Sequence, residues 1–165
     1  MFPHQDALAE GLRGTDLWCG EITEFLPDHV AATFEALCVR YTRERFGNEA
    51  PTVGSWWGDA LNEERRTGRR TVEEIDIVGA HRQRLRLVGE CKWTAKPMRK
   101  QVLDDLLTFK LPALLQEGRL TVPKEGLRIL LFARSGFDRA LKASAASDGR
   151  VELVTVEALA MALLD

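Results

Sequence analysis

The sequence lacks a long hydrophobic run. Its longest apolar stretches, 127–133 and 156–164, are each interrupted by a charged residue. Both are far shorter than the ~18 residues that a transmembrane helix needs. The first ten residues carry His, Asp and Glu, whereas a secretory signal begins with a cationic region followed by an apolar one. We therefore expect no membrane span and a cytoplasmic location.

Cysteine is also scarce. The three cysteines, Cys19, Cys38 and Cys91, cannot all pair, and none lies in a Cys-x-x-Cys unit or near a histidine at metal-ligand spacing. We interpret them as reduced, buried thiols. No serine or cysteine stands in a recognisable nucleophile motif, so covalent catalysis is not expected.

Internal repeats and low-complexity segments are absent as well, which excludes repeat architectures. A chain of 165 residues that is 45% apolar and 29% charged is typical of one globular domain. Its core is large enough to form without metal or disulfide support. Residues 1–27 mix short apolar patches with glycine and proline and are predicted to be an N-terminal helical extension, and residues 28–165 are predicted to be the main domain.

The apolar pattern predicts a mixed α/β fold. Asp28 is a suitable N-cap for a helix that ends near Phe46, and Pro112 is expected to split or kink a later helix. The expected order is α-β-β-β-α-β-α-β-α, a mixed sheet flanked by helices. The expected elements are a helix at 28–46, strands at 53–57, 72–78 and 84–93, a helix after Pro97, a strand at 127–133, a helix at 137–147, a strand at 151–156 and a final helix to Leu164. Residues 79–83 would join the second and third strands, and the charged stretch 62–70 is expected to be a loop.

Charge is unevenly distributed along the chain. The net charge is −2, yet residues 65–100 hold eleven Lys and Arg against four Asp and Glu. An acidic protein with such a basic window can still bind a polyanion there. The alternative for the first arginines of the window is a solvated turn paired with nearby glutamates.

One strand pair carries the most informative polar residues. Glu90 and Lys92 are two residues apart and should face the same side of a strand. If Ile75 and Ile77 share the core face of the preceding strand, Asp76 points to that same side. Carboxylates at close range repel unless a cation separates them, and Mg²⁺ suits such oxygen ligands. The metal ligands would be Asp76, Glu90 and the backbone carbonyl of Cys91, with Lys92 beside them. A solvated face or a cross-strand ion pair is the alternative.

These residues also carry a resemblance. The run Glu-Glu-Ile-Asp-Ile-Val at 73–78, followed by Gly-Glu-Cys-Lys-Trp at 89–93, resembles the active-site pattern of the PD-(D/E)XK nuclease superfamily, the restriction-endonuclease-like fold. With Phe34-Glu35, the run 53–57 and the run 135–137, the chain from about residue 28 to its end resembles the nuclease-like C-terminal domain of a family of archaeal and bacterial P-loop ATPases.

The resemblance implies roles for four residues. Asp76 and Glu90 would be metal ligands, Lys92 the base that organises the attacking water, and Glu35 an outer acid that reaches the metal directly or through water. A simply solvated Glu35 is an equal alternative, because it borders the apolar stripe of its helix. The superfamily's proline before the aspartate is replaced by Ile75. The cofactor would be Mg²⁺, with Mn²⁺ as a substitute.

Basic residues flank this pattern. Cations that could hold phosphates are expected around the site, namely Arg82, Arg84, Arg86, Lys96, Arg99 and Lys100. Ser135 is interpreted as the N-cap of the helix that follows it.

The sequence therefore predicts an enzyme, a Mg²⁺-dependent endonuclease that hydrolyses DNA phosphodiester bonds, with RNA as a less favoured substrate. The alternative is a non-catalytic module of the same fold that binds nucleic acid or docks to an ATPase. No Walker A motif occurs in the chain, which leaves a domain separated from its ATPase or a stand-alone relative. A homodimer is a further expectation, since a duplex has two strands to cut.

Overall fold

The computed structural model describes residues 23–61, 72–123 and 126–164. The chain divides into two compact units, 1–33 and 34–165. Of the first unit, the description covers the beginning of helix α3 (Thr23–Phe46). The second unit contains the sheet and every predicted site residue. The predicted extension at 1–27, for its first 22 residues, and the predicted loop at 62–70 lie outside the described residues.

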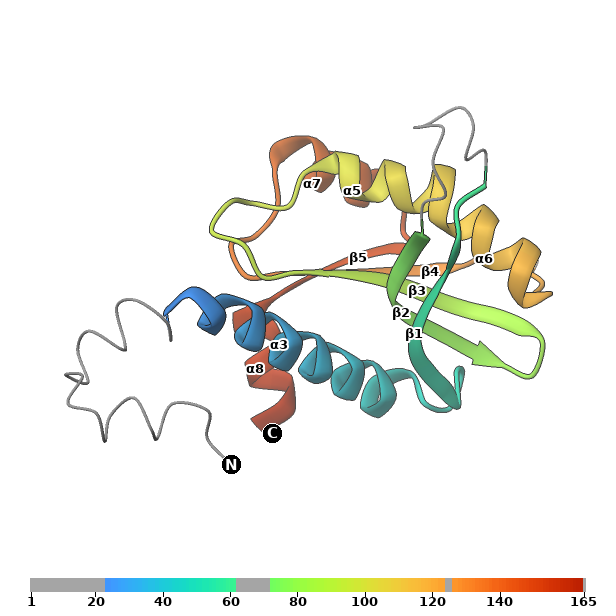
Figure 1. Ribbon diagram of the computed structural model, residues 1–165, viewed down its shortest axis with the longest axis horizontal. Helices are drawn as coiled ribbons and strands as arrows, with labels where there is room; N and C mark the ends of the chain where they lie inside the picture. The colour runs from blue at the N-terminus through green and yellow to red at the C-terminus, as the bar shows by residue number, and fades with distance from the viewer. Residues whose placement is uncertain (1–22, 62–71, 124–125, 165) are drawn as a thin grey trace, which may run out of the picture. The chain divides into compact units, whose positions relative to one another are not determined.

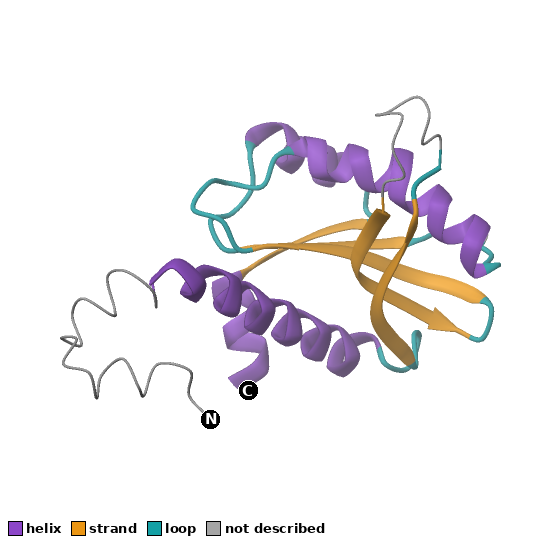
Figure 2. Ribbon diagram, in the orientation of Figure 1, coloured by secondary structure: helices purple, strands orange, loops and turns teal. Residues whose placement is uncertain are grey.

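A five-stranded mixed sheet forms the centre of the second unit (Figures 1 and 2). The strands lie side by side in chain order: β1 (Thr52–Asp59), β2 (Val72–His81), β3 (Arg84–Lys92), β4 (Arg128–Ala133) and β5 (Val151–Thr155). β2 pairs antiparallel with both β1 and β3, whereas β4 pairs parallel with both β3 and β5. Parallel neighbours need a crossover, which the intervening helices supply.

Helices cover both faces of this sheet (Figure 1). One face packs against α3 and α8 (Val156–Leu164), through a core that includes Phe34, Leu130 and Phe132. The other face packs against a helical segment and α7 (Arg139–Ser147). This segment consists of α5 (Lys100–Asp105), the π-helical η2 (Leu106–Lys110) and α6 (Leu111–Gly118). Sandwiched between two apolar layers, β4 is almost completely buried, as its continuous apolar run predicts.

The described elements confirm the mixed α/β fold, and they follow one another in the predicted order. Pro112 lies in the first turn of α6, where the long helical segment is divided as expected. Within 23–61, 72–123 and 126–164, no helix is long and apolar enough to cross a bilayer.

Three predicted boundaries were wrong. Helix α3 begins at Thr23, so Asp28 lies inside it and is not its N-cap. The hairpin between β2 and β3 has only Arg82 and Gln83 between its paired ends, with Arg82 at φ 59°. Positive φ in a two-residue turn matches the twist of the two strands. The short turn lets pairing continue to His81 and Arg84, so β2 is longer than predicted. The N-cap of α7 is Asp138, not Ser135.

The two candidate caps can be compared directly. The Asp138 carboxylate accepts a hydrogen bond from the Leu141 N–H at 2.7 Å, three residues ahead, which is the geometry of a cap. The Ser135 hydroxyl instead donates to the Thr94 carbonyl at 2.6 Å. Ser135 therefore joins the loop that follows β4 to the loop that follows β3.

A β-bulge interrupts β2 in the middle of the predicted site. Gly54 pairs with Val78 and Trp56 pairs with Ile75, so Asp76 and Ile77 together face the single residue between the two β1 partners. The extra residue changes which side of the sheet the following side chains face. Ile75 and Ile77 consequently belong to the cores on opposite faces, and the prediction that they share one face was wrong.

Candidate functional site

The bulge directs Asp76 into a gap between β2 and β3. The regular pairing of these strands ends at Ile77 and Gly89. Beyond that pair, the Cys91 N–H donates to Asp76 Oδ2 at 2.7 Å. A carboxylate therefore takes the place of a backbone acceptor in the ladder. This hydrogen bond ties the acid of β2 to the residue between Glu90 and Lys92.

Glu90 is the most deeply buried of the predicted site residues, with 1% of its side chain exposed. It lies on β3, and its carboxylate is held by Lys110, whose Nζ is 2.8 Å from Oε1 and 2.9 Å from Oε2. Burial and the negative charge of Asp76 raise the pKa of Glu90, and the ammonium groups of Lys110 and Lys92 only partly oppose them. Glu90 is thus an acid whose charge is costly in this position.

Lys92 lies between the two carboxylates at the exposed end of the cluster. Its Nζ is 3.6 Å from Glu90 Oε2 and 3.9 Å from Asp76 Oδ2, and 40% of its side chain is exposed. Burial lowers the pKa of Lys92, but the charges of Asp76 and Glu90, together with a hydrogen bond to Glu90, contribute to a net rise. In this arrangement Lys92 is an ammonium cation.

Glu35 lies at the periphery of the same cluster. It belongs to α3, and its side chain is exposed. Partial desolvation and the negative charges of Asp76 and Glu74 raise its pKa, while Lys92 lowers it. The structure therefore brings Asp76, Glu90 and Lys92 together from β2 and β3, with Glu35 in electrostatic reach from a helix on one side of the sheet.

Asp76 and Glu90 are the two carboxylates of the cluster that could serve as ligands of a divalent cation. In the described part of the chain, no group of three or more His, Cys, Asp or Glu side chains is arranged to hold a metal. Mg²⁺ does not require three, since it is commonly bound by one or two carboxylates and several waters. Both Glu90 oxygens are already engaged by Lys110, so a metal would have to compete with that ammonium. The Cys91 carbonyl as a third ligand stays a prediction.

Lys110 was not identified from the sequence. It ends the π-helical η2, and it contacts Glu90 from the layer that covers β3. A signal was available, because Lys110 is the one charged residue in the run 106–115, which is otherwise almost entirely apolar. A buried lysine in such a run needs an anionic partner. Sequence periodicity does not name that partner.

The predicted phosphate-binding cations separate into two groups. Lys96 and Arg99 line an open groove of about 600 Å³ together with Lys92, beside the carboxylates. Lys100 adjoins this group, but its Nζ is 2.6 Å from Asp104 Oδ1. The hairpin arginines, Arg82, Arg84 and Arg86, lie toward the opposite end of β3. Arg86 precedes Lys92 by six positions, or about 20 Å of strand. The expectation that these arginines surround the acidic cluster was therefore wrong.

The fold and the site together define a mixed α/β protein with an acid–lysine cluster at a bulge in its sheet. The model of DUF234, a family described as archaeal and bacterial proteins of unknown function, matches residues 2–102, and the chain belongs to this family. The matched region includes Glu35, Asp76, Glu90 and Lys92, whereas Lys110 lies beyond it. No curated protein and no solved structure matches the chain.

Proposed function

We propose that this protein is a Mg²⁺-dependent nuclease that hydrolyses phosphodiester bonds in DNA, with Mn²⁺ as a substitute metal. The observation that supports it best is the convergence of Asp76, Glu90 and Lys92 at the point where β2 and β3 separate. The spacing of these residues resembles the PD-(D/E)XK pattern. Two carboxylates that stand close together beside a lysine, one of them with a pKa raised by burial and by the charge of the other, form a centre suited to a divalent cation.

Each side chain has a distinct role in this proposal. Asp76 and Glu90 would hold the metal, which when bound supplies a Lewis acid and an activated water. The hydrogen bond from the Cys91 N–H keeps the Asp76 carboxylate in its orientation. Glu35, on the exposed side of the cluster, would contact the metal's water shell.

Lys92 acts as a cation in this proposal. Its raised pKa favours the ammonium form, which donates hydrogen bonds and cannot accept a proton. Lys92 would therefore orient the attacking water and offset the negative charge that develops on the phosphate. The role of Lys92 as the base that organises the attacking water stays a prediction for the metal-bound site, where the added positive charge would lower the pKa of Lys92.

The substrate would enter over the groove that adjoins Lys92. Lys96 and Arg99 are exposed on its rim. Among the described residues they form no ion pair, so both charges are available for phosphates on either side of the bond that is cut. Contacts of this kind do not depend on base sequence and weaken as salt increases.

A cleavage panel tests the proposal. Linear duplex, single-stranded, circular and branched DNA, together with RNA, would be incubated with the full chain in Mg²⁺, Mn²⁺ or EDTA. Cleavage should require the metal and fall at least about 100-fold in Asp76→Asn and in Lys92→Ala. Glu44→Gln and Lys142→Ala, which remove an exposed acid and an exposed cation elsewhere, should cleave like the unaltered protein. Cleavage that persists in EDTA or in Asp76→Asn would refute it.

The contact between Lys110 and Glu90 favours a second candidate function. This ion pair neutralises the acidic cluster without a metal, as expected of a non-catalytic module of the same fold that binds nucleic acid or docks to a P-loop ATPase. Calorimetric titration with Mn²⁺ separates the two functions. The nuclease requires metal binding that Asp76→Asn removes, whereas the non-catalytic module predicts no specific binding in either protein.

A further inference from the structure

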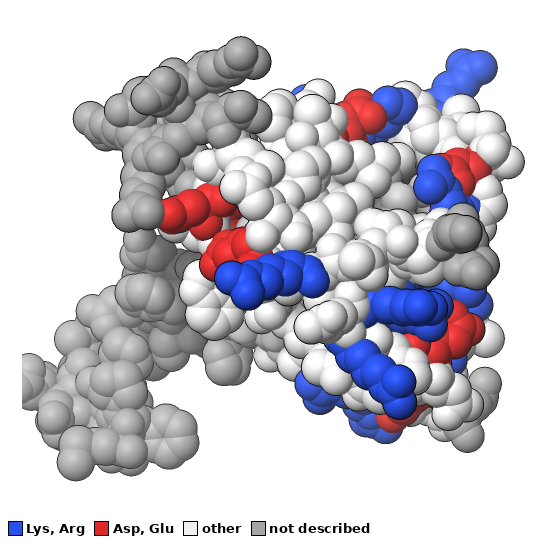
Figure 3. Space-filling view, turned by 90° about the vertical axis from the view of Figure 1, so that its right-hand side faces the viewer, with Lys and Arg blue, Asp and Glu red and all other residues white. Residues whose placement is uncertain are grey.

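A second basic region lies at the end of the sheet that is remote from the acidic cluster. The residues that begin β3, β4 and β5 stand close together there, because Leu87 pairs with Arg128 and Ile129 pairs with Val151. Figure 3 shows the side of the molecule on which the β2–β3 hairpin ends, where Lys and Arg side chains are prominent among fewer carboxylates. None of these residues takes part in the proposed hydrolysis.

The hairpin contributes a groove in which none of the described lining residues is acidic. This groove, here called the arginine groove, has a volume of about 690 Å³. Its described lining residues are His81, Arg82, Gln83, Arg84, Arg86 and Thr121. Thr121 is fixed against the hairpin, because its N–H donates to the Gln83 carbonyl at 2.9 Å and its carbonyl accepts from the Leu85 N–H at 2.9 Å. These two hydrogen bonds hold the hairpin that carries the arginines against Thr121.

A second bulge directs Arg86 into this region. Gly79 pairs with Leu87 and Ala80 pairs with Leu85, which leaves Arg86 as the extra residue of β3. Its Nε–H is buried and has no hydrogen-bond partner among the described residues. A buried donor without an acceptor is unfavourable, so an acceptor from a ligand would be stabilising.

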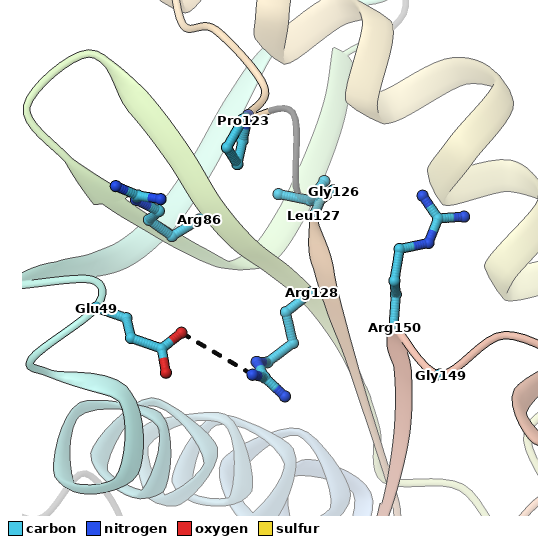
Figure 4. Close-up of a pocket in the computed structure, with 8 residues that line it drawn as sticks. All are labelled: Glu49, Arg86, Pro123, Gly126, Leu127, Arg128, Gly149 and Arg150. Atoms are coloured by element: carbon cyan, nitrogen blue, oxygen red, sulfur yellow. Dashed lines mark ion pairs between the residues drawn. The ribbon is translucent and has the colours of Figure 1, made fainter.

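The neighbouring arginines, in contrast, are already neutralised. Arg128 has Glu49 and Glu152 at 3.9 Å, and its guanidinium lies 4.7 Å from the centre of a phenylalanine ring. Arg150 pairs with Asp148. Figure 4 shows Arg128 joined to Glu49 by an ion pair, whereas no ion pair joins Arg86 to any of the other residues drawn.

Among residues 23–61, 72–123 and 126–164, none forms an ion pair with Arg82, Arg84 or Arg86. Three arginines without carboxylates would repel one another unless an anion binds among them. The planar guanidinium group matches the oxygens of phosphate better than any other side chain does. The three arginines are arranged along a hairpin and an open groove, not around a closed socket, and this favours an extended ligand over a single free phosphate.

We propose that the arginine groove binds consecutive phosphodiester groups of a nucleic-acid backbone, at a site separate from the acidic cluster. This inference rests on the proposed function for its partner, nucleic acid, but binding in the groove does not require that the nucleic acid be hydrolysed. Its distance from Lys92 makes it an anchor for nucleic acid that extends well beyond the bond to be cut.

Binding of a fluorescent 30-base-pair duplex to the full chain in EDTA tests this inference by anisotropy. Arg82→Gln combined with Arg84→Gln should weaken binding roughly tenfold near 0.1 M salt and reduce the slope of log K against log[salt] by about 2, the value for two lost phosphate contacts. Arg86→Lys, which keeps the charge but removes the buried donor, should weaken binding with little change in slope. The control is Arg40→Gln combined with Lys142→Gln, which removes two exposed charges on helices and should bind like the unaltered protein.

Three results would overturn the inference. One is an equal loss of affinity in the control pair, which would indicate a general charge effect. Another is displacement of the duplex by millimolar inorganic phosphate at constant ionic strength, which would indicate a single-phosphate site. The third is equal displacement by polyglutamate, which would indicate a site for acidic chains in general. Cleavage is measured separately from binding. If Asp76→Asn binds DNA through the arginines but does not cut it, this inference still holds.

Discussion

Lys110 holds both carboxylate oxygens of Glu90, at 2.8 and 2.9 Å, and thereby connects η2 to β3. The glutamate is buried, and the lysine side chain is only 20% exposed. A π-helical turn widens a helix locally and occurs frequently at functional sites. Here the turn ends at the lysine that neutralises the candidate metal ligand, so the cluster has an internal cation in the position where a metal would act.

Replacing Lys110 by methionine should destabilise the protein without metal. Glu90 would remain buried without its donor, and we expect the free energy of unfolding at neutral pH to fall by about 1–3 kcal/mol. If a metal and Lys110 compete for Glu90, Mg²⁺ should raise the melting temperature of Lys110→Met more than that of the unaltered protein. Urea unfolding and thermal melts with and without Mg²⁺ measure both effects.

Lys100→Met is the control for that comparison. Lys100 pairs with Asp104 in a more exposed position, where ion pairs contribute little. Its loss should change stability by less than about 1 kcal/mol. An equal response of both variants to Mg²⁺ would show that Lys110 does not occupy the place of a metal.

Glu90→Gln should be at least as stable as the unaltered protein at pH 7. The raised pKa of Glu90 means that its ionised form is disfavoured in the folded state, and glutamine resembles the neutral form. The advantage should shrink as the pH falls through the raised pKa toward the ordinary value of 4.5. Urea unfolding at pH 7 and at lower pH tests this. A less stable Glu90→Gln at pH 7 would mean that Lys110 fully compensates the charge.

Gly89→Ala should displace the strand that carries Glu90. A Cβ at position 89 would lie 2.6 Å from the backbone oxygen of Leu130 on β4, so the two strands would have to separate. We expect a loss of about 1–3 kcal/mol in unfolding free energy, with reduced cleavage. Gly54→Ala is the matched control on β1, because a Cβ there meets nothing within 4 Å. Chemical denaturation of both variants measures this difference in stability. Equal stabilities would contradict the close approach of β3 and β4 at Gly89.

The thiols of Cys38 and Cys91 should be unreactive in the folded protein. Both are buried, and a hydrogen bond with Cys38, together with burial, raises the pKa of Cys91 well above its ordinary value. Since the thiolate is the reactive form, a Cys19→Ser variant should react with an aromatic disulfide reagent at pH 8 only after urea unfolding. Rapid modification of one thiol per chain under native conditions would contradict this.

The site shows where sequence reasoning succeeds. The alternation of β3 correctly placed Glu90 and Lys92 on one side, because no bulge lies between them. The sequence also predicted that Asp76 lies beside them, but one premise of that prediction was wrong. The assumption that Ile75 and Ile77 share a face fails at the bulge, and the same bulge directs the Asp76 carboxylate to the Cys91 N–H.

Contacts between residues far apart in the chain could not be predicted from the sequence. Lys110 follows Glu90 by 20 residues and reaches it only because η2 packs over β3. The hairpin arginines are close in sequence to the cluster, yet an extended strand carries them away from it. Proximity in sequence therefore misled the prediction for Arg82, Arg84 and Arg86.

The sequence by itself determined the mixed α/β class, the order of the described elements and the chemical types at 76, 90 and 92, because hydrophobic periodicity is local and depends on neighbouring residues alone. The tertiary structure decided the bulges in β2 and β3, the capture of Glu90 by Lys110 and the separation of the arginine groove from the acidic cluster. These features depend on which strands and helices pack together, and the free energy of that packing is shared among residues far apart in the chain.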